Sequence, residues 1–217
     1  FTYKETKTTY SLSDIPALKD EAYVNNVKNY IASVEHELNG TRFPNEPFEN
    51  FSTDWETVVK YIYDADSFGP ELNKTGYFEK DIDALTSGTN SMIEKAALIF
   101  NHVKSTMNWN EFYGYGCDVG VRKAYQDKVG NSAEINLMLT AMLRYVGIDA
   151  NPILISTRGN GISLSPSRTA FDYVIAGIEL ENQVILLDAT NKYALPNILP
   201  IRDLNWFGRR IRKDGTS

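Results

Sequence analysis

The sequence contains one cysteine and two histidines, and each scarcity excludes a class of protein. A single cysteine forms no internal disulfide, so the 217 residues must fold around their hydrophobic side chains, which make up 42% of the chain. We expect Cys117 to be a buried or loop thiol. The two histidines, His36 and His102, are too few for most zinc sites. We expect neither a metal nor an organic cofactor.

Positive charge and long apolar runs are also scarce. Lysine and arginine total 22 against 28 acidic residues, a net charge of −6, which disfavours nonspecific binding to nucleic acid. Apolar runs such as residues 96–100 and 184–187 fall far short of the roughly 20 residues that a membrane helix needs. We expect no nucleic-acid partner and no membrane span. The basic run over residues 202–213 is interpreted as a linker, or else as a contact for an acidic partner or anionic lipid.

The first 48 residues differ from the rest of the chain. They are polar, and residues 30–38 mostly alternate between apolar and polar side chains, which predicts a β-strand. Such a strand needs a partner, either residues 2–12 or a sheet outside this sequence. Pro44 and Pro47 mark a linker. We interpret residues 1–48 as an extension, the end of a preceding β-domain plus a linker, and residues 49–217 as a core with a C-terminal linker.

Three segments of the core have helical periodicity, with apolar residues over 55–62, 93–103 and 135–143. The residues that suit helix N-caps are Ser52 or Thr53, Asn90 or Ser91, and Asn131 or Ser132. The third segment is apolar on nearly every side, which predicts a buried central helix. Gly147 is well placed to end that helix.

After this helix the pattern changes to strands. Residues 152–157, 173–179 and 183–187 are rich in strand-forming side chains, and residues 181–182 join the last two as a hairpin. Helices followed by a meander of strands predict an α+β fold in which helices pack on an antiparallel sheet.

Three short motifs within this pattern carry the chemistry. They open the buried helix, begin one strand and end the next: Gly130-Asn131-Ser132, Phe171-Asp172-Tyr173 and Leu187-Asp188-Ala189-Thr190. Together with Arg144 and Gly147 near the helix end, the arrangement resembles the transglutaminase-like superfamily, which has the papain-like thiol fold. The resemblance spans about residues 55–206, and it implies a papain-like core with its site at the three motifs.

In that superfamily a cysteine begins the helix, a histidine lies on the strand and an aspartate follows the next strand. The helix dipole and the histidine lower the pKa of such a cysteine, and the aspartate orients the histidine. Here Ser132 stands at the cysteine position and Tyr173 at the histidine position, while Asp188 is retained 15 positions after Tyr173. A phenol with a pKa of about 10 is a poor base at neutral pH. The residues therefore predict loss of the family's acyl-transfer or amidase activity.

The resemblance is closer to one branch of the superfamily. In that branch, exported bacterial proteins have a β-sandwich before the transglutaminase-like core and a second small β-domain after it. Residues 14–21 and 30–38 look like the end of that sandwich. The chain begins at Phe1 with neither a methionine nor a signal-peptide pattern, so we expect a piece of a longer protein. The resemblance implies an exported, periplasmic or cell-envelope protein whose flanking β-domains contact this core.

Three functions remain open. We expect a catalytically degenerate module that binds a peptide or protein in its vestigial cleft or acts as a scaffold. The alternative is a serine- or cysteine-dependent amidase or peptidase with a non-standard base, for which Glu134 is a candidate. A purely structural spacer would instead have its cleft filled by side chains such as Tyr113 and Tyr173.

Each candidate site residue also has a structural interpretation. Ser132 suits a helix N-cap, and Tyr173 suits a buried aromatic residue whose hydroxyl bonds Asp188. Asp188 itself suits a turn cap. Glu134 suits a solvated charge near a helix start, where the dipole favours it.

Overall fold

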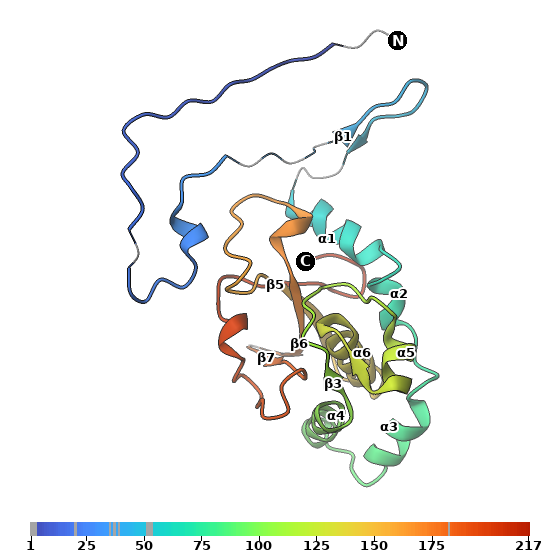
Figure 1. Ribbon diagram of the computed structural model, residues 1–217. Coiled ribbons are helices and arrows are strands. Elements are labelled where there is room, and N and C mark those ends of the chain that lie inside the picture. Colours follow the sequence, from blue (N-terminus) through green and yellow to red (C-terminus); the bar gives the residue numbers. More distant parts are fainter. Residues whose placement is uncertain are drawn as a thin grey trace.

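The chain folds into a core of helices around an antiparallel sheet, with N-terminal residues that extend away from it (Figure 1). The computed structural model describes residues 4–19, 21–34, 36, 38, 40–50, 54–181 and 183–217. The α+β class predicted from the sequence is confirmed. Within the described ranges, no helix is long and apolar enough to cross a membrane.

Helix α6, Ser132–Tyr145, forms the centre of the core. Its residues 132–143 are all buried, because the helix is apolar on nearly every side and packs against both the sheet and other helices. Asn131 caps it: its Oδ1 accepts the Glu134 N–H at 2.8 Å, and Glu134 accepts the Asn131 N–H at 2.6 Å. Gly147 follows the helix with a φ of +86°. The predicted buried helix and its glycine stop are confirmed.

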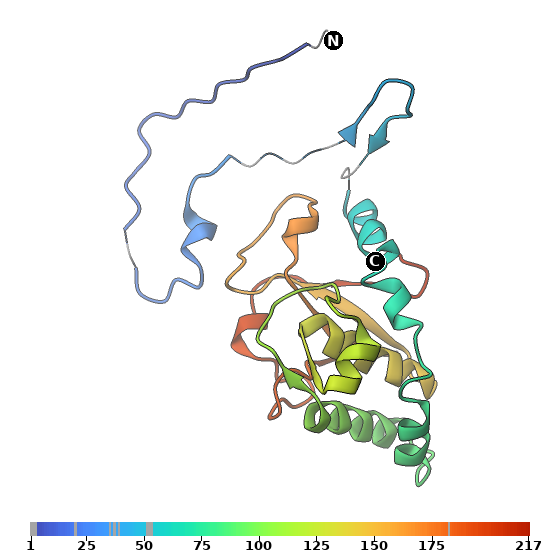
Figure 2. The same ribbon diagram turned by 45° about the vertical axis from the view of Figure 1, so that its right-hand side comes forward.

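The other helices of the described chain surround α6. Helices α1, Trp55–Asp64, and α4, Met92–Thr106, are those that periodicity predicts, and α4 runs along the lower side of the core (Figure 2). The expected caps Ser52 and Thr53 lie outside the described residues, and Asp54 caps α1. Three short helices were not predicted: α2, Gly69–Leu72, α3, Glu79–Thr86, and α5, Val121–Asp127.

The four-stranded sheet has the order β7-β6-β5-β8 and is antiparallel throughout. Strands β5, Ala150–Ile155, β6, Tyr173–Leu180, and β7, Gln183–Leu187, lie close to their predicted positions. The predicted hairpin between β6 and β7 is confirmed by their pairing. Strand β8, Arg209–Arg210, pairs with β5. The expectation of a C-terminal linker is therefore wrong here, because the basic run supplies an edge strand of the core.

A short parallel pair brings one loop to the start of α6. Strand β3, Asn108–Trp109, pairs with β4, Val129–Gly130, which directly precedes the cap of α6. Residues 110–117, which follow β3, therefore lie beside the helix N-terminus. Asn131 Nδ2 donates to the carbonyl of Gly116 at 3.0 Å and holds this loop in place.

The N-terminal extension has little regular structure. It contains a 3-10 helix, Val27–Tyr30, and a hairpin of β1, Gly40–Thr41, with β2, Glu49–Asn50, where the sequence predicted a linker. The described residues of segments 2–12 and 30–38 form no strand, so the predicted strand is wrong for them; Glu35 and Glu37 lie outside the described residues. Alternation of side chains does not produce a strand without a neighbouring backbone to pair with.

The extension touches the core at one loop. Asn26 Nδ2 donates to the carbonyl of Arg158 at 2.7 Å, and Asn29 Oδ1 accepts the Ile162 N–H at 2.8 Å. No described residue of segment 4–49 is buried.

Candidate functional site

Tyr173 and Asp188 meet at one end of the sheet. Tyr173 begins β6 and Asp188 directly follows β7, and the antiparallel register of the two strands brings them together. The Tyr173 hydroxyl lies 3.2 Å from Asp188 Oδ2 and 2.9 Å from Thr190 Oγ1. The expected bond between Tyr173 and Asp188 is present.

Ser132 faces a different partner. Its hydroxyl donates to the carbonyl of Gly114 at 2.7 Å and accepts the N–H of the same residue at 3.0 Å. The cap of α6 is Asn131, so the expectation that Ser132 caps the helix is wrong. Among the described residues, the hydrogen-bond partners of the Ser132 hydroxyl include neither a carboxylate nor an imidazole.

Asn136 joins α6 to the two other motifs. It lies one turn after Ser132 on the helix, and its Nδ2 donates to Asp188 Oδ1 at 2.9 Å and to the carbonyl of Val174 at 3.0 Å. Its Oδ1 accepts the Ala189 N–H at 2.9 Å. Asn136 was not predicted as a site residue, although a buried amide side chain in a largely apolar helix, one turn from Ser132, was a usable signal.

Arg202 is the second site residue that was not predicted from the sequence. Its Nη2 donates to Asp188 Oδ2 at 2.9 Å, to Thr190 Oγ1 at 2.7 Å and to the Tyr173 hydroxyl at 3.2 Å. Its guanidinium also stacks over the ring of Trp109, 4.6 Å from the centroid. The interpretation of residue 202 as part of a solvated linker is wrong, because its guanidinium closes the site.

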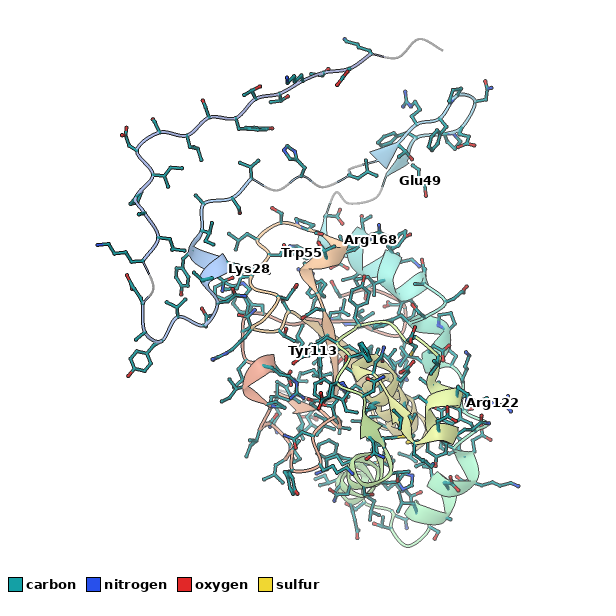
Figure 3. The ribbon with its side chains drawn as sticks, in the orientation of Figure 1. Lys28, Glu49, Trp55, Tyr113, Arg122 and Arg168 are labelled. Carbon is teal, nitrogen blue, oxygen red and sulfur yellow. The ribbon has the colours of Figure 1, made fainter. Side chains whose placement is uncertain are left out.

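Aromatic rings pack beside Tyr173, one of the three family positions Ser132, Tyr173 and Asp188. Tyr113 comes from the loop that binds Ser132 and lies over the core (Figure 3). Its ring centroid is 5.7 Å from that of Tyr173 and 5.5 Å from that of Trp109. Ser132, Tyr173 and Asp188 each have 0% of their surface exposed. The three positions are therefore shielded from solvent.

Burial sets the protonation of the site. Burial and the nearby Asp188 charge raise the pKa of Tyr173 far above its usual range, so its hydroxyl stays protonated. Burial, followed by the charge of Asp188, also raises the pKa of Asp203 to about 8, even though the Arg202 guanidinium acts in the opposite direction.

Glu134 is a structural carboxylate. One oxygen accepts the backbone N–H groups of residues 118, 119 and 120 at 2.8, 2.7 and 3.2 Å, and the other accepts that of Asn131. The residue is 1% exposed, so the expectation of a solvated charge is wrong. Because four donors occupy its oxygens, Glu134 is poorly placed to take a proton from Ser132.

Among the described residues, the remaining reactive side chains, Cys117, His36 and His102, form no hydrogen bond with Ser132, Tyr173 or Asp188. Burial, with the charge of Glu134, raises the pKa of the Cys117 thiol and so disfavours its thiolate. His102 lies on α4 with its Nε2 3.4 Å from the Tyr125 hydroxyl, and His36 is an exposed residue of the extension. The described residues contain no group of three or more His, Cys, Asp and Glu side chains arranged so that it could hold a metal ion.

Comparison with known proteins adds a family and a fold. The family model described as Transglutaminase-like superfamily matches residues 81–185. No curated protein matches the chain.

Two solved structures resemble the chain. A "putative protease" from Parabacteroides distasonis aligns with a TM-score of 0.51 and 14% identity over 74% of this chain and 32% of its own. A "putative cysteine protease" from Cytophaga hutchinsonii aligns with a TM-score of 0.41 and 13% identity over 69% of this chain and 47% of its own. This chain thus spans about a third of the first protein and about half of the second. At such identity the first likeness supports the fold alone.

Proposed function

Because residues 81–185 match the family model of the transglutaminase-like superfamily, we propose that this chain is a catalytically degenerate member, the non-catalytic core of a larger exported protein. One observation carries the proposal. The hydroxyl at the nucleophile position is fully buried, and both of its hydrogen bonds are to the backbone of Gly114.

Acyl transfer needs a nucleophile and a base that takes its proton. The Ser132 proton is directed at a peptide carbonyl oxygen, which is not a general base at neutral pH. Tyr173 stands where the family has its base, but its raised pKa keeps the phenol protonated. Asp188 retains its orienting position without an imidazole to orient.

A scaffold role fits this site better than peptide binding in the vestigial cleft. A peptide in the cleft would have to displace Tyr113 and the stacked pair of Trp109 and Arg202. Each of those side chains already makes contacts that a ligand would need to replace. These contacts support a module that holds neighbouring domains through its outer surface.

The proposed neighbours are flanking β-domains of the same exported protein. The N-terminal extension has large apolar side chains in solvent, among them Leu12, Leu18 and Val34, which are 67%, 52% and 53% exposed. Exposed apolar side chains along one segment favour a binding partner for that segment. A preceding β-domain would provide such a partner.

A fluorophosphonate probe separates this proposal from a serine amidase or peptidase. The folded protein and its Ser132→Ala variant are treated with the probe, beside a serine hydrolase as a positive control, and adducts are mapped by mass spectrometry. We expect no adduct at Ser132 while the control enzyme is labelled. A stoichiometric adduct on Ser132 that is absent from the variant would overturn the proposal and show an activated hydroxyl.

A further inference from the structure

Two buried carboxyl groups share one guanidinium at the edge of the site. Asp188 is 0% exposed and Asp203 is 5% exposed. Arg202 lies between them, with Nη2 2.9 Å from Asp188 Oδ2 and Nε 3.6 Å from Asp203 Oδ1. Two ionised carboxylates and one guanidinium would leave a net negative charge in a buried place, which is costly.

The hydrogen bonds of the two carboxyl groups are unequal. Asp188 accepts bonds from Asn136, from the Thr190 N–H and from Arg202. Neither oxygen of Asp203 receives a hydrogen bond from a described donor, and burial, followed by the charge of the nearby Asp188, acts against ionisation of the Asp203 carboxyl group, so that its pKa is raised. A neutral Asp203 has an O–H to donate to Asp188, so one proton relieves both the missing bond and the excess charge.

The segment that holds Asp203 is weakly packed. We call residues 200–207 the strap; it includes the 3-10 helix Ile201–Asp203. Its apolar side chains face solvent, with Ile201, Trp206 and Phe207 69%, 58% and 80% exposed. Polar contacts hold it, chiefly those of Arg202 in the site and those of Asn205 Nδ2 with carbonyls of residues 156, 157 and 161.

We propose that the Asp203 carboxyl group is protonated at neutral pH and that its O–H donates a hydrogen bond to Asp188. In mildly alkaline solution this proton is lost to solvent, and its loss loosens the strap from the site. The Asp203 O–H bond is the only bond that breaks, and its proton passes to hydroxide or water of the solvent. After the proton is lost, Asp188 repels Asp203 and the newly buried charge favours exposure of the strap to water. Polar segments with few apolar contacts open at low free-energy cost.

The other charged groups around Asp203 do not replace this proton. On the strand side, Tyr173 stays neutral, and Asp172 adds further negative charge while it accepts bonds from Thr157.

Toward the outer face of the sheet, three arginines line the same hollow as Asp203. Their partners are Glu56 and Ser217 for Arg209, Glu179 for Arg210, and the Ser217 carbonyl for Arg212.

Nuclear magnetic resonance tests the proton directly. The ¹³C chemical shift of the Asp203 carboxyl carbon is followed from pH 4 to pH 10 in the wild-type protein. We expect a titration far above the usual value of about 4. A midpoint near 4 would overturn the proposal, and this readout needs no variant to fold.

Hydrogen exchange tests the motion. Amide exchange of the strap is compared at pH 6.5 and pH 9.5 after correction for the intrinsic rates, in the wild type, in Asp203→Asn and in the exposed control Asp214→Asn. We expect strap protection to fall about tenfold at the higher pH in the wild type and in Asp214→Asn, and to stay constant in Asp203→Asn. An equal fall in all three proteins would contradict the proposal. Neither result depends on whether Ser132 is catalytic, so the proposed function is tested separately.

Discussion

Glu134 takes the place of water for four backbone N–H groups, three from residues 118–120 and one from Asn131. A buried carboxylate is tolerated only where such donors compensate its lost hydration. These bonds tie the segment just before α5 to the start of α6, beside the loop that covers Ser132. A single side chain thus fixes the geometry on one side of the candidate site.

We predict that Glu134→Gln lowers the free energy of unfolding by about 2–4 kcal/mol, because an amide loses the charge and places a donor against the Asn131 N–H. Urea unfolding followed by circular dichroism measures this change. The exposed Glu181→Gln is the matched control and should change stability by less than about 0.5 kcal/mol. Similar effects at both positions would contradict the structural role of Glu134.

A second prediction concerns pH and Asp203. Its folded-state pKa is raised to about 8 from an unfolded value near 4, so the folded state retains a proton that the unfolded state has lost. The proton on Asp203 stabilises the folded state fully below about pH 4. This stabilisation is lost as the pH rises from about 4 to about 8. We expect Asp203→Asn to be more stable than the wild type by on the order of 2 kcal/mol at pH 9. Equal unfolding free energies of the wild-type protein at pH 5 and at pH 9 would contradict this prediction.

The side-chain contacts of the site were only partly predictable. The Tyr173–Asp188 contact followed from two neighbouring strands and the motifs at their ends. Arg202 was missed because its position depends on a turn of the chain after Asp188, and a run of basic residues usually indicates solvated charge. The sequence predicted that Ser132 caps α6, because Asn131 and Ser132 both suit a helix N-cap. Only the path of residues 110–117 distinguishes the two residues.

Helix α6 determines the position of the whole site, because its start carries Ser132 and its second turn carries Asn136. Long helices with caps and clear apolar faces were predictable, as α1, α4 and α6 show. The short helices α2, α3 and α5 have too few turns to make a periodic signal, and tertiary packing stabilises them. The described residues of segment 30–38 form no strand for the opposite reason, since a strand depends on a neighbouring backbone to pair with.

The glycine that follows the C-terminus of α6 leads to a prediction about stability. Gly147 has a φ of +86°, which favours glycine, and a Cβ there would meet its nearest neighbour at an ordinary 3.7 Å. We expect Gly147→Ala to cost about 1 kcal/mol through backbone strain alone. Gly88→Ala, where an added Cβ meets nothing within 4 Å, is the control. Thermal unfolding of both variants measures the difference, and equal melting temperatures would be the contrary result.

At the scale of the whole molecule, the extension and the core differ in burial. The core buries the continuous apolar cluster around α6, whereas no described residue of segment 4–49 is buried. The boundary proposed from the sequence near residue 48 agrees with this contrast and stays a prediction. Composition and proline placement indicated the boundary, but they carried no information about which surface the extension contacts.

We predict that the core folds without residues 1–48. The lost contacts are mainly the hydrogen bonds of Asn26 and Asn29 to one loop, so removal should change the unfolding free energy by about 1 kcal/mol or less. Chemical unfolding of the shortened and full chains measures this. Loss of cooperative unfolding in the shortened chain would show that the extension is part of the core.

The central claim is that the nucleophile position is closed as well as chemically altered, and the alkylation rate of a thiol placed there tests it most directly. Ser132→Cys in a Cys117→Ala background is treated with iodoacetamide in the folded state and in urea, with Cys117→Ala alone as the control for background labelling. We predict that folding slows alkylation at position 132 by at least about 100-fold, because the position is buried and no described base hydrogen-bonds its side chain. Alkylation of the folded protein as fast as, or faster than, the unfolded chain would contradict the account and indicate an open, activating site.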